Sequence, residues 1–540
     1  MKFKEGSINL VLFMLIAGTV LFYACGKDNP VAQDDETRLF RPVLNEQLFA
    51  EDNMIIVDMG DMKDAASYTL EVSRDTFQTV ELALEVDTHY VEIDSLLWDT
   101  IYQVRATAHA DDEELDSKVS DLGAVRTQRF PSIMELPESY DVTDVAARVF
   151  WETGGAPVTG VKVFAADDEK LTSPLIEEDV SMEEQDAEEK FVYGLEPSTE
   201  YQIAIYSDGE LRGWADYTTK EALPMGDNVV DLRGIDRESI LADTLQYVSD
   251  GSVVLLESGR QYAADGYHFD KSVTIRSAYG FTPGGATIDC SSNFNVQDGA
   301  VVDSVVFRDV TLTGNFDSNY VFNINNSGQV GEIKFHSSNI RSLRGITRMK
   351  GGAGKLEKYT IYNSVVDSIN GYAVLTVDTE EWSVDDIRLE NSTFSKIQYF
   401  LVSRSNTNSI LIESSTINEA PERGRQMFRW RGSEGNNNVL NGVEINNTIW
   451  GHGWNMDGEE DYAVSGVDGM ENTNFSIVNT YTTNQFSFSG DEIPGFPSFV
   501  YDGTANDLWE NPYNGVGFDI QDSGFAGKGD AGDPRWRIGL

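Results

Sequence analysis

A short segment with alternating apolar positions recurs along the second half of the chain at nearly constant intervals. Each copy begins with two apolar residues that are separated by one residue. Two polar residues follow, then a Ser, Thr, Asn or Val, and then another apolar residue. The copies begin at Val305, Ile333, Tyr359, Ile387, Ile410 and Val443, at intervals of 28, 26, 28, 23 and 33 residues. One circuit of a three-sided β-helix needs a length of this order. Because such repeats bury their apolar sides only against their neighbours, the pattern predicts a parallel β-helix.

A second set of segments recurs within the same coils, at intervals near 27 residues. These segments begin at Gly345, Ala373, Phe400 and Gln426. We expect them to stack as one parallel sheet, with about 4.8 Å between coils. Strict alternation would place Arg348 and Arg429 on the same face as the apolar residues two positions before them. The opposite face would then carry Thr347, Leu375, Val402 and Phe428. Two arginines cannot be buried unpaired, so we expect a local bulge, and the pattern leaves the register open.

Two units precede the solenoid, at residues 38–128 and 133–220, and both consist of short alternating segments separated by turn residues. This sequence pattern is typical of β-sandwiches. The second unit contains the motif L-E-P-S-T-E-Y, which ends at Tyr201, and the first contains a related segment without the proline, which ends at Tyr102. A tyrosine at this position can turn its hydroxyl back onto upstream backbone, as in immunoglobulin-like sandwiches. Both units therefore resemble fibronectin type III modules.

The remaining residues, 225–540, are assigned to the β-helix. Residues 237–248 fit a short helix that caps the first coil, and residues 251–262 resemble the opening coil of pectate-lyase-like right-handed β-helices. The predicted fold class is therefore all-β, with two immunoglobulin/fibronectin-like β-sandwiches followed by a right-handed parallel β-helix. The Gly- and Asp-rich tail from Leu508 to Trp536 is expected to form an ordered loop or a final coil rather than a helix.

The N-terminal segment has a positively charged start and an apolar run at residues 8–23, and Ala24 stands directly before Cys25. An apolar run this short after a charged start is typical of a signal peptide rather than a membrane span. We therefore expect residues 1–24 to be removed, Cys25 to carry a lipid, and residues 25–37 to tether the chain to the outer membrane at the cell surface. The segment resembles the tolerant lipobox of Bacteroidota. An ordinary secretory signal with an incidental cysteine is the alternative.

The charge of the chain is strongly negative, with 90 acidic and 40 basic residues and a formal net charge of −50. This composition disfavours nucleic acid as a partner, because phosphate binding needs a basic surface. The scarce basic residues gather in the solenoid, several of them beside a tryptophan. The candidate glycan-binding residues are Arg348, Lys350, Arg404, Arg425, Arg429, Trp430 and Arg431.

These arginines and the tryptophan have the chemistry that recognition of an acidic sugar requires. Guanidinium groups bind carboxylates bidentately, and an indole face stacks on a sugar ring. The leading hypothesis is therefore that the chain binds an acidic polysaccharide, such as pectin, for glycan capture. The residues also leave a structural alternative open, in which the arginines pair with the nearby acids Glu413, Glu422 and Glu434. In that case the chain would be a non-catalytic structural adhesin.

A polysaccharide lyase that cleaves uronate polymers by β-elimination is the second hypothesis. Such an enzyme neutralises the sugar carboxylate with Ca²⁺ or arginine and removes a proton with a basic side chain, for which Arg429 and Arg431 are the candidates. Asp378, Glu380 and Glu381 could supply oxygen ligands to Ca²⁺, but the sequence has no dense carboxylate cluster. The pectate lyase motifs W-I-D-H and R-x-P-x-x-R and the paired aspartate motifs of β-helical polygalacturonases are absent. The sequence therefore favours binding over cleavage.

The last residues of the chain include a distinctive G-D-P-R-W motif, from Gly532 to Trp536. Together with the signal segment, the two sandwiches and the β-helix, it resembles a family of uncharacterised Bacteroidota surface lipoproteins. That resemblance implies a gene position beside outer-membrane glycan importers and a role in the capture or cleavage of plant cell-wall polysaccharide. An importer of this kind is the implied protein partner. The resemblance supplies no site residues, because the binding or active residues of the family are not established.

Overall fold

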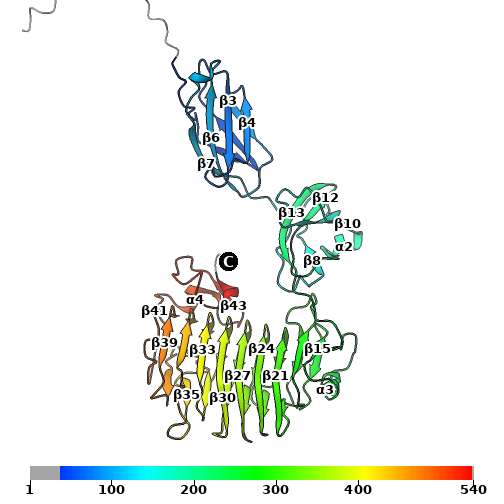
Figure 1. Cartoon of the computed structure of the whole chain (residues 1–540), viewed down its shortest axis with the longest axis vertical. Helices are drawn as coiled ribbons and strands as arrows, with labels where there is room; N and C mark the ends of the chain where they lie inside the picture. The colour runs from blue at the N-terminus through cyan, green and yellow to red at the C-terminus, as the bar shows by residue number, and fades with distance from the viewer. Residues whose placement is uncertain (1–36, 538–540) are drawn as a thin grey trace, which may run out of the picture. The chain divides into compact units, whose positions relative to one another are not determined.

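A computed structural model describes residues 37–537 of the chain. The regular elements of this part are mostly strands (Figure 1). Cys25 and the signal segment lie outside the described residues, so the lipid anchor stays a prediction. The chain divides after Pro131 into two compact units. Between residues 37 and 537, no helix is long and apolar enough to cross a bilayer.

The first unit is a two-sheet β-sandwich. One sheet contains β1 (Phe49–Glu51), β2 (Met54–Asp58) and β5 (Tyr90–Ile93), and the other contains β4 (Leu82–Val86), β3 (Ser67–Ser73), β6 (Ile101–His109) and β7 (Ser120–Arg126), with a 3₁₀ turn at Glu113–Leu115. Alternate residues of β2, β3 and β6 are buried between the sheets. The backbone N–H of Leu97 donates a hydrogen bond to the hydroxyl of Tyr102 at 3.0 Å, which is the tyrosine corner expected from the sequence.

A second sandwich opens the second unit. Its larger sheet has the order β10 (Ile176–Asp179), β9 (Gly160–Ala165), β12 (Glu200–Ser207) and β13 (Glu210–Thr218), and its smaller sheet pairs β11 (Glu189–Tyr193) with β8 (Ala146–Phe150). A short helix, α2 (Met182–Ala187), precedes β11. A tyrosine corner forms here too, since the N–H of Glu196 donates to the hydroxyl of Tyr201 at 2.9 Å. Both sandwiches thus have the fibronectin-like architecture that the sequence predicted.

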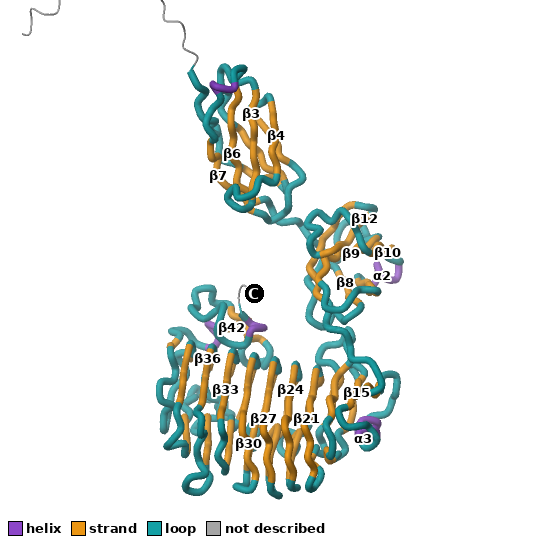
Figure 2. Tube along the Cα trace, viewed as in Figure 1, coloured by secondary structure: helices purple, strands orange, loops and turns teal. Residues whose placement is uncertain are grey.

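A parallel β-solenoid follows, and its coils build three long sheets (Figure 1, Figure 2). The first sheet consists of β14 (Val229–Asp231), β15 (Ser252–Leu256), β18 (Val273–Ser277), β21 (Ala300–Arg308), β24 (Gly328–His336), β27 (Gly354–Tyr362), β30 (Trp382–Glu390), β33 (Ser409–Glu413), β36 (Val443–Asn446) and β39 (Phe475–Val478). The second consists of β16 (Gln261–Ala263), β19 (Ala286–Asp289), β22 (Val310–Thr313), β25 (Asn339–Leu343), β28 (Val365–Ile369), β31 (Thr393–Ile397), β34 (Thr416–Asn418), β37 (Ile449–Trp450), β40 (Tyr481–Thr482) and β41 (Phe499–Val500). The third consists of β23 (Tyr320–Ile324), β26 (Gly345–Met349), β29 (Leu375–Val377), β32 (Leu401–Ser403), β35 (Gln426–Trp430) and β38 (Ser465–Asp468), after the short pair β17 (His268–Phe269) and β20 (Asn295–Val296). The predicted all-β fold class, with a parallel β-helix after two sandwiches, is confirmed.

The repeats that define the first sheet pair in the predicted register. One row of cross-strand partners runs through Val305, Ile333, Tyr359, Ile387, Ile410, Val443 and Phe475. These side chains enter the core between the sheets, because side chains alternate along each strand. The helix α3 (Ile240–Leu245) lies against β16 near the first coil, close to the position expected for a cap, and buries Leu241 and Leu245.

A sharp corner joins the first sheet to the second in each coil. The corner residue has φ between 46° and 56° at Asp309, Ser337, Asn363, Asn391, Ser414, Asn447 and Asn479. Small polar residues tolerate this left-handed conformation better than bulky ones. From Ser338 onward the next residue is a buried Ser or Thr, and the N–H of Ser338 donates to Ser364 Oγ at 3.1 Å. The N–H of Ser364 donates in turn to Ser392 Oγ at 3.0 Å, so the serines that follow the corner form a hydrogen-bonded ladder across these coils.

The sequence left the register of the third sheet open. Equal spacing of its segments would align Leu375 with Val402, but β29 and β32 pair Leu375 with Leu401. The cause is the length of the connection from the second sheet, because residues 370–374 precede Leu375 whereas only residues 398–400 precede Leu401. The apolar pattern does not constrain the length of a connection, so it did not reveal this slip.

The tail folds back along the outer side of the second sheet. It contains the single helical turn α4 (Ala505–Leu508), β42 (Trp509–Asn511), β43 (Gly517–Ile520) and a 3₁₀ turn at Pro534–Trp536. The buried carboxylate of Asp533 accepts a hydrogen bond from Thr393 Oγ1 at 2.7 Å, and the Asp533 N–H donates to Thr416 Oγ1 at 2.9 Å. Gly532 has φ 78°, and a Cβ there would lie 2.9 Å from Thr416 Oγ1, so a side chain would clash. The G-D-P-R-W motif is the clamp that holds the tail on the solenoid.

Replacing Asp533 with alanine tests this clamp. The hydroxyl of Thr393 would lose its buried acceptor, so we expect the free energy of unfolding to fall by about 1–3 kcal/mol. Thermal unfolding and the rate of proteolysis after Lys528 measure the effect. Asp530→Ala changes an exposed aspartate of the same tail and should leave both quantities unchanged. Equal effects of the two substitutions would contradict the clamp.

Candidate functional site

Two of the predicted arginines, Arg348 and Arg429, belong to one row on the third sheet. The row of cross-strand partners consists of Asn323, Arg348, Thr376, Val402, Arg429 and Asp468. Ile346 and Thr347 are both buried, but β23 and β26 pair with one constant offset, so the expected bulge does not form in β26. Arg348 then points outward while Met349 returns to the core. Arg348 and Arg429 thus lie on the outer side of this sheet, with the buried residues Thr376 and Val402 between them in the row.

Asp378, which directly follows β29, is the centre of the site. Its carboxylate accepts hydrogen bonds from Arg348 Nη2 at 2.6 Å, Arg431 Nη2 at 3.1 Å and Arg404 Nε at 3.4 Å. Burial opposes the charged form of Asp378, but the hydrogen bonds and positive charges of Arg348, Arg431 and Arg404 outweigh it and lower the pKa of Asp378. The carboxylate therefore remains ionised and holds three guanidinium groups together.

The positive charge around Asp378 exceeds the negative charge. Burial, and then the nearby charges of Arg404 and Arg429, lower the pKa of Arg431. The Nε atoms of Arg348 and Arg431 are buried without a hydrogen-bond partner. Each guanidinium has five N–H donors, whereas one carboxylate offers about four acceptor positions. The buried Nε atoms are out of reach of a ligand, but the side chains of Arg404 and Arg431 are 39% and 31% exposed, so an incoming carboxylate can contact their accessible donors.

Two tyrosines hold these arginines in place. The guanidinium carbon of Arg348 lies 3.9 Å from the ring centroid of Tyr372. The corresponding distances from Arg425 and Arg429 to the Tyr399 ring are 4.8 and 5.7 Å. Cation–π contacts of this kind attract and orient the guanidinium group. We call the whole surface the arginine face, and it consists of Arg348, Arg404, Arg425, Arg429 and Arg431 with Asp378, Tyr372 and Tyr399.

Trp430 is the predicted site residue that the structure corrects. Its side chain is 1% exposed and belongs to the hydrophobic core, so its indole cannot stack on a sugar. The cause is its position in β35, where Arg429 faces outward and the next residue must face inward. The sequence missed Tyr372 and Tyr399, the aromatic residues that do lie on this surface, because both stand before a strand rather than within the arginine-rich segment.

The remaining predicted residues lie at the edges of this surface. Arg425 pairs with Glu422 at 3.2 Å, which is one of the acid partners that the structural alternative named, and Arg429 pairs with Asp468 at 3.2 Å. Both pairs are partly exposed, so each contributes little to stability. Lys350 follows β26 and is exposed.

Calcium does not fit the oxygen atoms that the sequence suggested for it. The oxygens of Asp378 accept hydrogen bonds from arginines, whose positive charge repels a cation. The carboxylate of Glu380 accepts from the N–H and the hydroxyl of Ser433 at 2.7 and 2.8 Å. Within residues 37–537, no three His, Cys, Asp or Glu side chains are placed to hold a metal ion. The groups that this site itself offers to neutralise a carboxylate are the guanidinium groups of its arginines.

Comparisons with known proteins match part of the solenoid to a family but assign no function to it. The sequence profile of a family described as a domain of unknown function (DUF4957) matches residues 262–397, a region that contains Arg348 and Asp378 but not the later arginines. Among solved structures, the FN1–FN3 domains of chicken CNTN1 align with 34% of this chain and 68% of their own, at 14% identity and a TM-score of 0.15. So low a TM-score carries no argument. No protein with a curated description matches the chain.

Replacing Asp378 with asparagine tests the charge balance of the site. Three guanidinium groups would then repel one another without a counter-charge, so we expect a loss of about 2–3 kcal/mol in the free energy of unfolding, partly restored by sulfate. Asp468→Asn removes a carboxylate that pairs with one arginine and is 46% exposed, and should cost less than about 1 kcal/mol. Denaturant unfolding with and without sulfate gives both values. An unchanged stability of the Asp378 variant would show that the arginines do not need this anion.

Proposed function

We propose that this protein is a cell-surface lipoprotein that binds an acidic polysaccharide, such as pectin, along the arginine face. The observation that carries the proposal is the convergence of three guanidinium groups on Asp378. In a chain with a net charge of −50, such a local excess of positive charge requires a specific reason. Recognition of a carboxylate supplies that reason, because guanidinium donors bind it in a fixed geometry.

The dimensions of the face favour a polymer over a small molecule. Arg348 and Arg429 occupy one column of the third sheet and are separated by three strand spacings, which is about 14 Å. A polyuronate carries a carboxylate on each sugar, so several carboxylates of one strand can contact the column at once. Multivalent contact of this kind raises the affinity of the whole chain above that of any single contact.

The proposed location extends the sequence prediction for the N-terminus. A lipid on Cys25 and a polar tether would hold the protein at the outer membrane, with the described residues outside the cell. An outer-membrane glycan importer is the partner proposed to receive the captured polysaccharide.

Binding to polygalacturonate tests the proposal directly. We expect the double variant Arg404→Gln, Arg431→Gln to lose about tenfold in affinity or more, equivalent to about 1.4 kcal/mol, because two of the three guanidinium groups around Asp378 are removed. Arg388→Gln changes a partly exposed arginine of the first sheet and is the matched control. Isothermal titration or affinity electrophoresis gives the constants. Failure of the unmodified protein to bind any acidic glycan would replace this proposal with the structural adhesin.

One observation favours a lyase as the second candidate function. The lowered pKa of Arg431, caused by burial and by its arginine neighbours, is the direction that an arginine base requires, because the base must release its own proton first. If the protein binds polygalacturonate without cleaving it, no unsaturated uronate forms, and the ultraviolet absorbance does not increase when the protein and the polymer are incubated together. An increase that Arg431→Gln abolishes and Arg388→Gln preserves would establish the lyase instead.

A further inference from the structure

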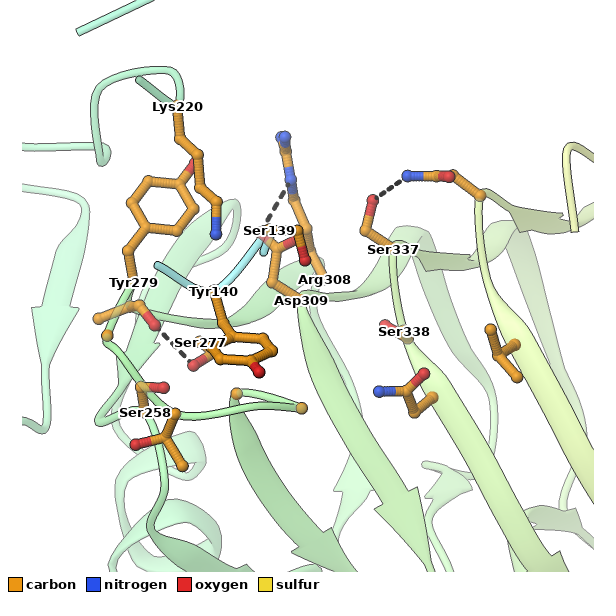
Figure 3. Close-up of a pocket in the computed structure, with 18 of the residues that line it drawn as sticks. Ser139, Tyr140, Lys220, Ser258, Ser277, Tyr279, Arg308, Asp309, Ser337 and Ser338 are labelled. Atoms are coloured by element: carbon orange, nitrogen blue, oxygen red, sulfur yellow. Dashed lines mark hydrogen bonds and ion pairs between the residues drawn. The ribbon is translucent and has the colours of Figure 1, made fainter. Parts of the chain in front are cut away.

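A pocket of about 830 Å³ lies within the second unit, away from the arginine face (Figure 3). Residues 138–140 and 220–221 of the second sandwich form one wall, the first coils of the solenoid form the other, and Arg535 and Trp536 of the tail also line the pocket. On the solenoid side, the pocket follows the corner residues Asp309, Ser337 and Asn363, which stand in successive coils. Its volume falls within the range of about 300–1,000 Å³ that is usual for small-molecule sites.

Specific contacts hold the two walls together. The carboxylate of Glu221, from the sandwich, lies 2.8 Å from Arg308 Nη2 and 3.4 Å from Arg276 Nη1 of the solenoid. The ring of Phe191 packs against that of Phe281, with centroids 4.8 Å apart. The sandwich and the solenoid therefore share polar and aromatic contacts around the pocket.

Lys220, Arg308 and Arg535 line the pocket together with the carboxylates of Glu138, Glu221 and Asp309, and the guanidinium of Arg276 lies behind the lining. Arg276 is buried and donates to Asp309 at 3.0 Å and to the Tyr279 hydroxyl at 2.9 Å. Arg308 also pairs with Asp309. Lys220 lies over the Tyr279 ring at 5.0 Å, and no carboxylate among the described residues is within ion-pairing distance of its Nζ.

The buried surroundings of Lys220 oppose its positive charge. Burial lowers the pKa of Lys220, and the more distant charge of Asp309 only partly opposes the shift. Including Arg276, four cations thus lie with the three carboxylates of Glu138, Glu221 and Asp309 at the pocket. A half-buried ammonium group without a carboxylate partner is stabilised when an anion binds beside it.

The remaining lining of the pocket matches a sugar. The hydroxyl groups of Ser139, Ser258 and Ser337 line it together with the amides of Asn339 and Asn363. The Tyr140 ring lies at the pocket wall (Figure 3). Hydroxyl and amide groups exchange hydrogen bonds with sugar hydroxyls, and an aromatic ring packs against the apolar face of a sugar.

We propose that this pocket is a second glycan site, which binds a short acidic oligosaccharide with one sugar carboxylate between Lys220 and Arg308. The site rests on its own residues and does not depend on the arginine face. It differs from that face because a bounded pocket of about 830 Å³ suits a short chain or a chain end, whereas the row of arginines along the third sheet suits a long polymer.

The experiment titrates the full chain with trigalacturonic acid and, separately, with a neutral galactose trisaccharide. We expect Lys220→Gln to weaken binding of the acidic trisaccharide about tenfold, and Ser139→Trp, at an exposed position of the rim, to block it. Lys118→Gln, on the first sandwich, is the control for the loss of one exposed lysine. The Arg404→Gln, Arg431→Gln background should retain the effect of Lys220→Gln, which separates this site from the arginine face.

Two results would overturn the pocket proposal whatever the arginine face does. Unchanged affinity for trigalacturonic acid in both Lys220→Gln and Ser139→Trp would exclude the pocket as the site. Equal affinity for the neutral trisaccharide would exclude the carboxylate as the recognised group. Because Ser139 is exposed and makes no contact on which the fold depends, its variant keeps the test valid if Lys220→Gln reduces stability.

Discussion

The in-register pairing of successive coils is the constraint on which the rest of the solenoid depends. One coil cannot bury its apolar side chains alone, so each coil is stable only between two neighbours. Pairing turns equivalent positions into columns, such as the stacked rings of Phe307 and Phe335, whose centroids are 5.7 Å apart. The inward columns are apolar, and the left-handed corner of each coil keeps them aligned by a ladder of serine hydrogen bonds. Outward columns are free to carry charge, and Arg348 and Arg429 share one of them.

The three sheets differ in what covers their outer sides, and this difference determines where a ligand can bind. The tail occupies the outer side of the second sheet through Asp533 and its hydrogen bonds to Thr393 and Thr416. The third sheet carries the arginine face instead. The corner between the first and second sheets meets the second sandwich, and the pocket lies there. Each candidate site thus follows from how a surface of one regular solenoid is covered.

The sequence predicted the features that depend on local periodicity. It placed the row from Val305 to Val443 correctly and named both tyrosine corners. It could not fix the direction of Trp430, because an arginine on each side of it gives no sign of which residue faces the core. The role of Asp378 was only partly visible, since its partners Arg404 and Arg431 come from later coils. Lys220 was not predicted at all, because its neighbours in the pocket belong to a different domain of the sequence.

The strongly negative charge of the chain also limits how it can bind an acidic polymer. The chain and an acidic polymer are both negatively charged, so long-range attraction cannot bring the polymer to the surface. Their long-range repulsion is also weak, because charges more than about 8 Å apart are largely screened at physiological ionic strength. Binding must therefore rely on contacts made at close range, with guanidinium groups that are already oriented. Asp378, Tyr372 and Tyr399 provide that orientation before any ligand arrives, so a bound carboxylate loses little free energy to side-chain ordering. The acids within the arginine face are thus compatible with anion binding, because they fix the geometry without matching the positive charge.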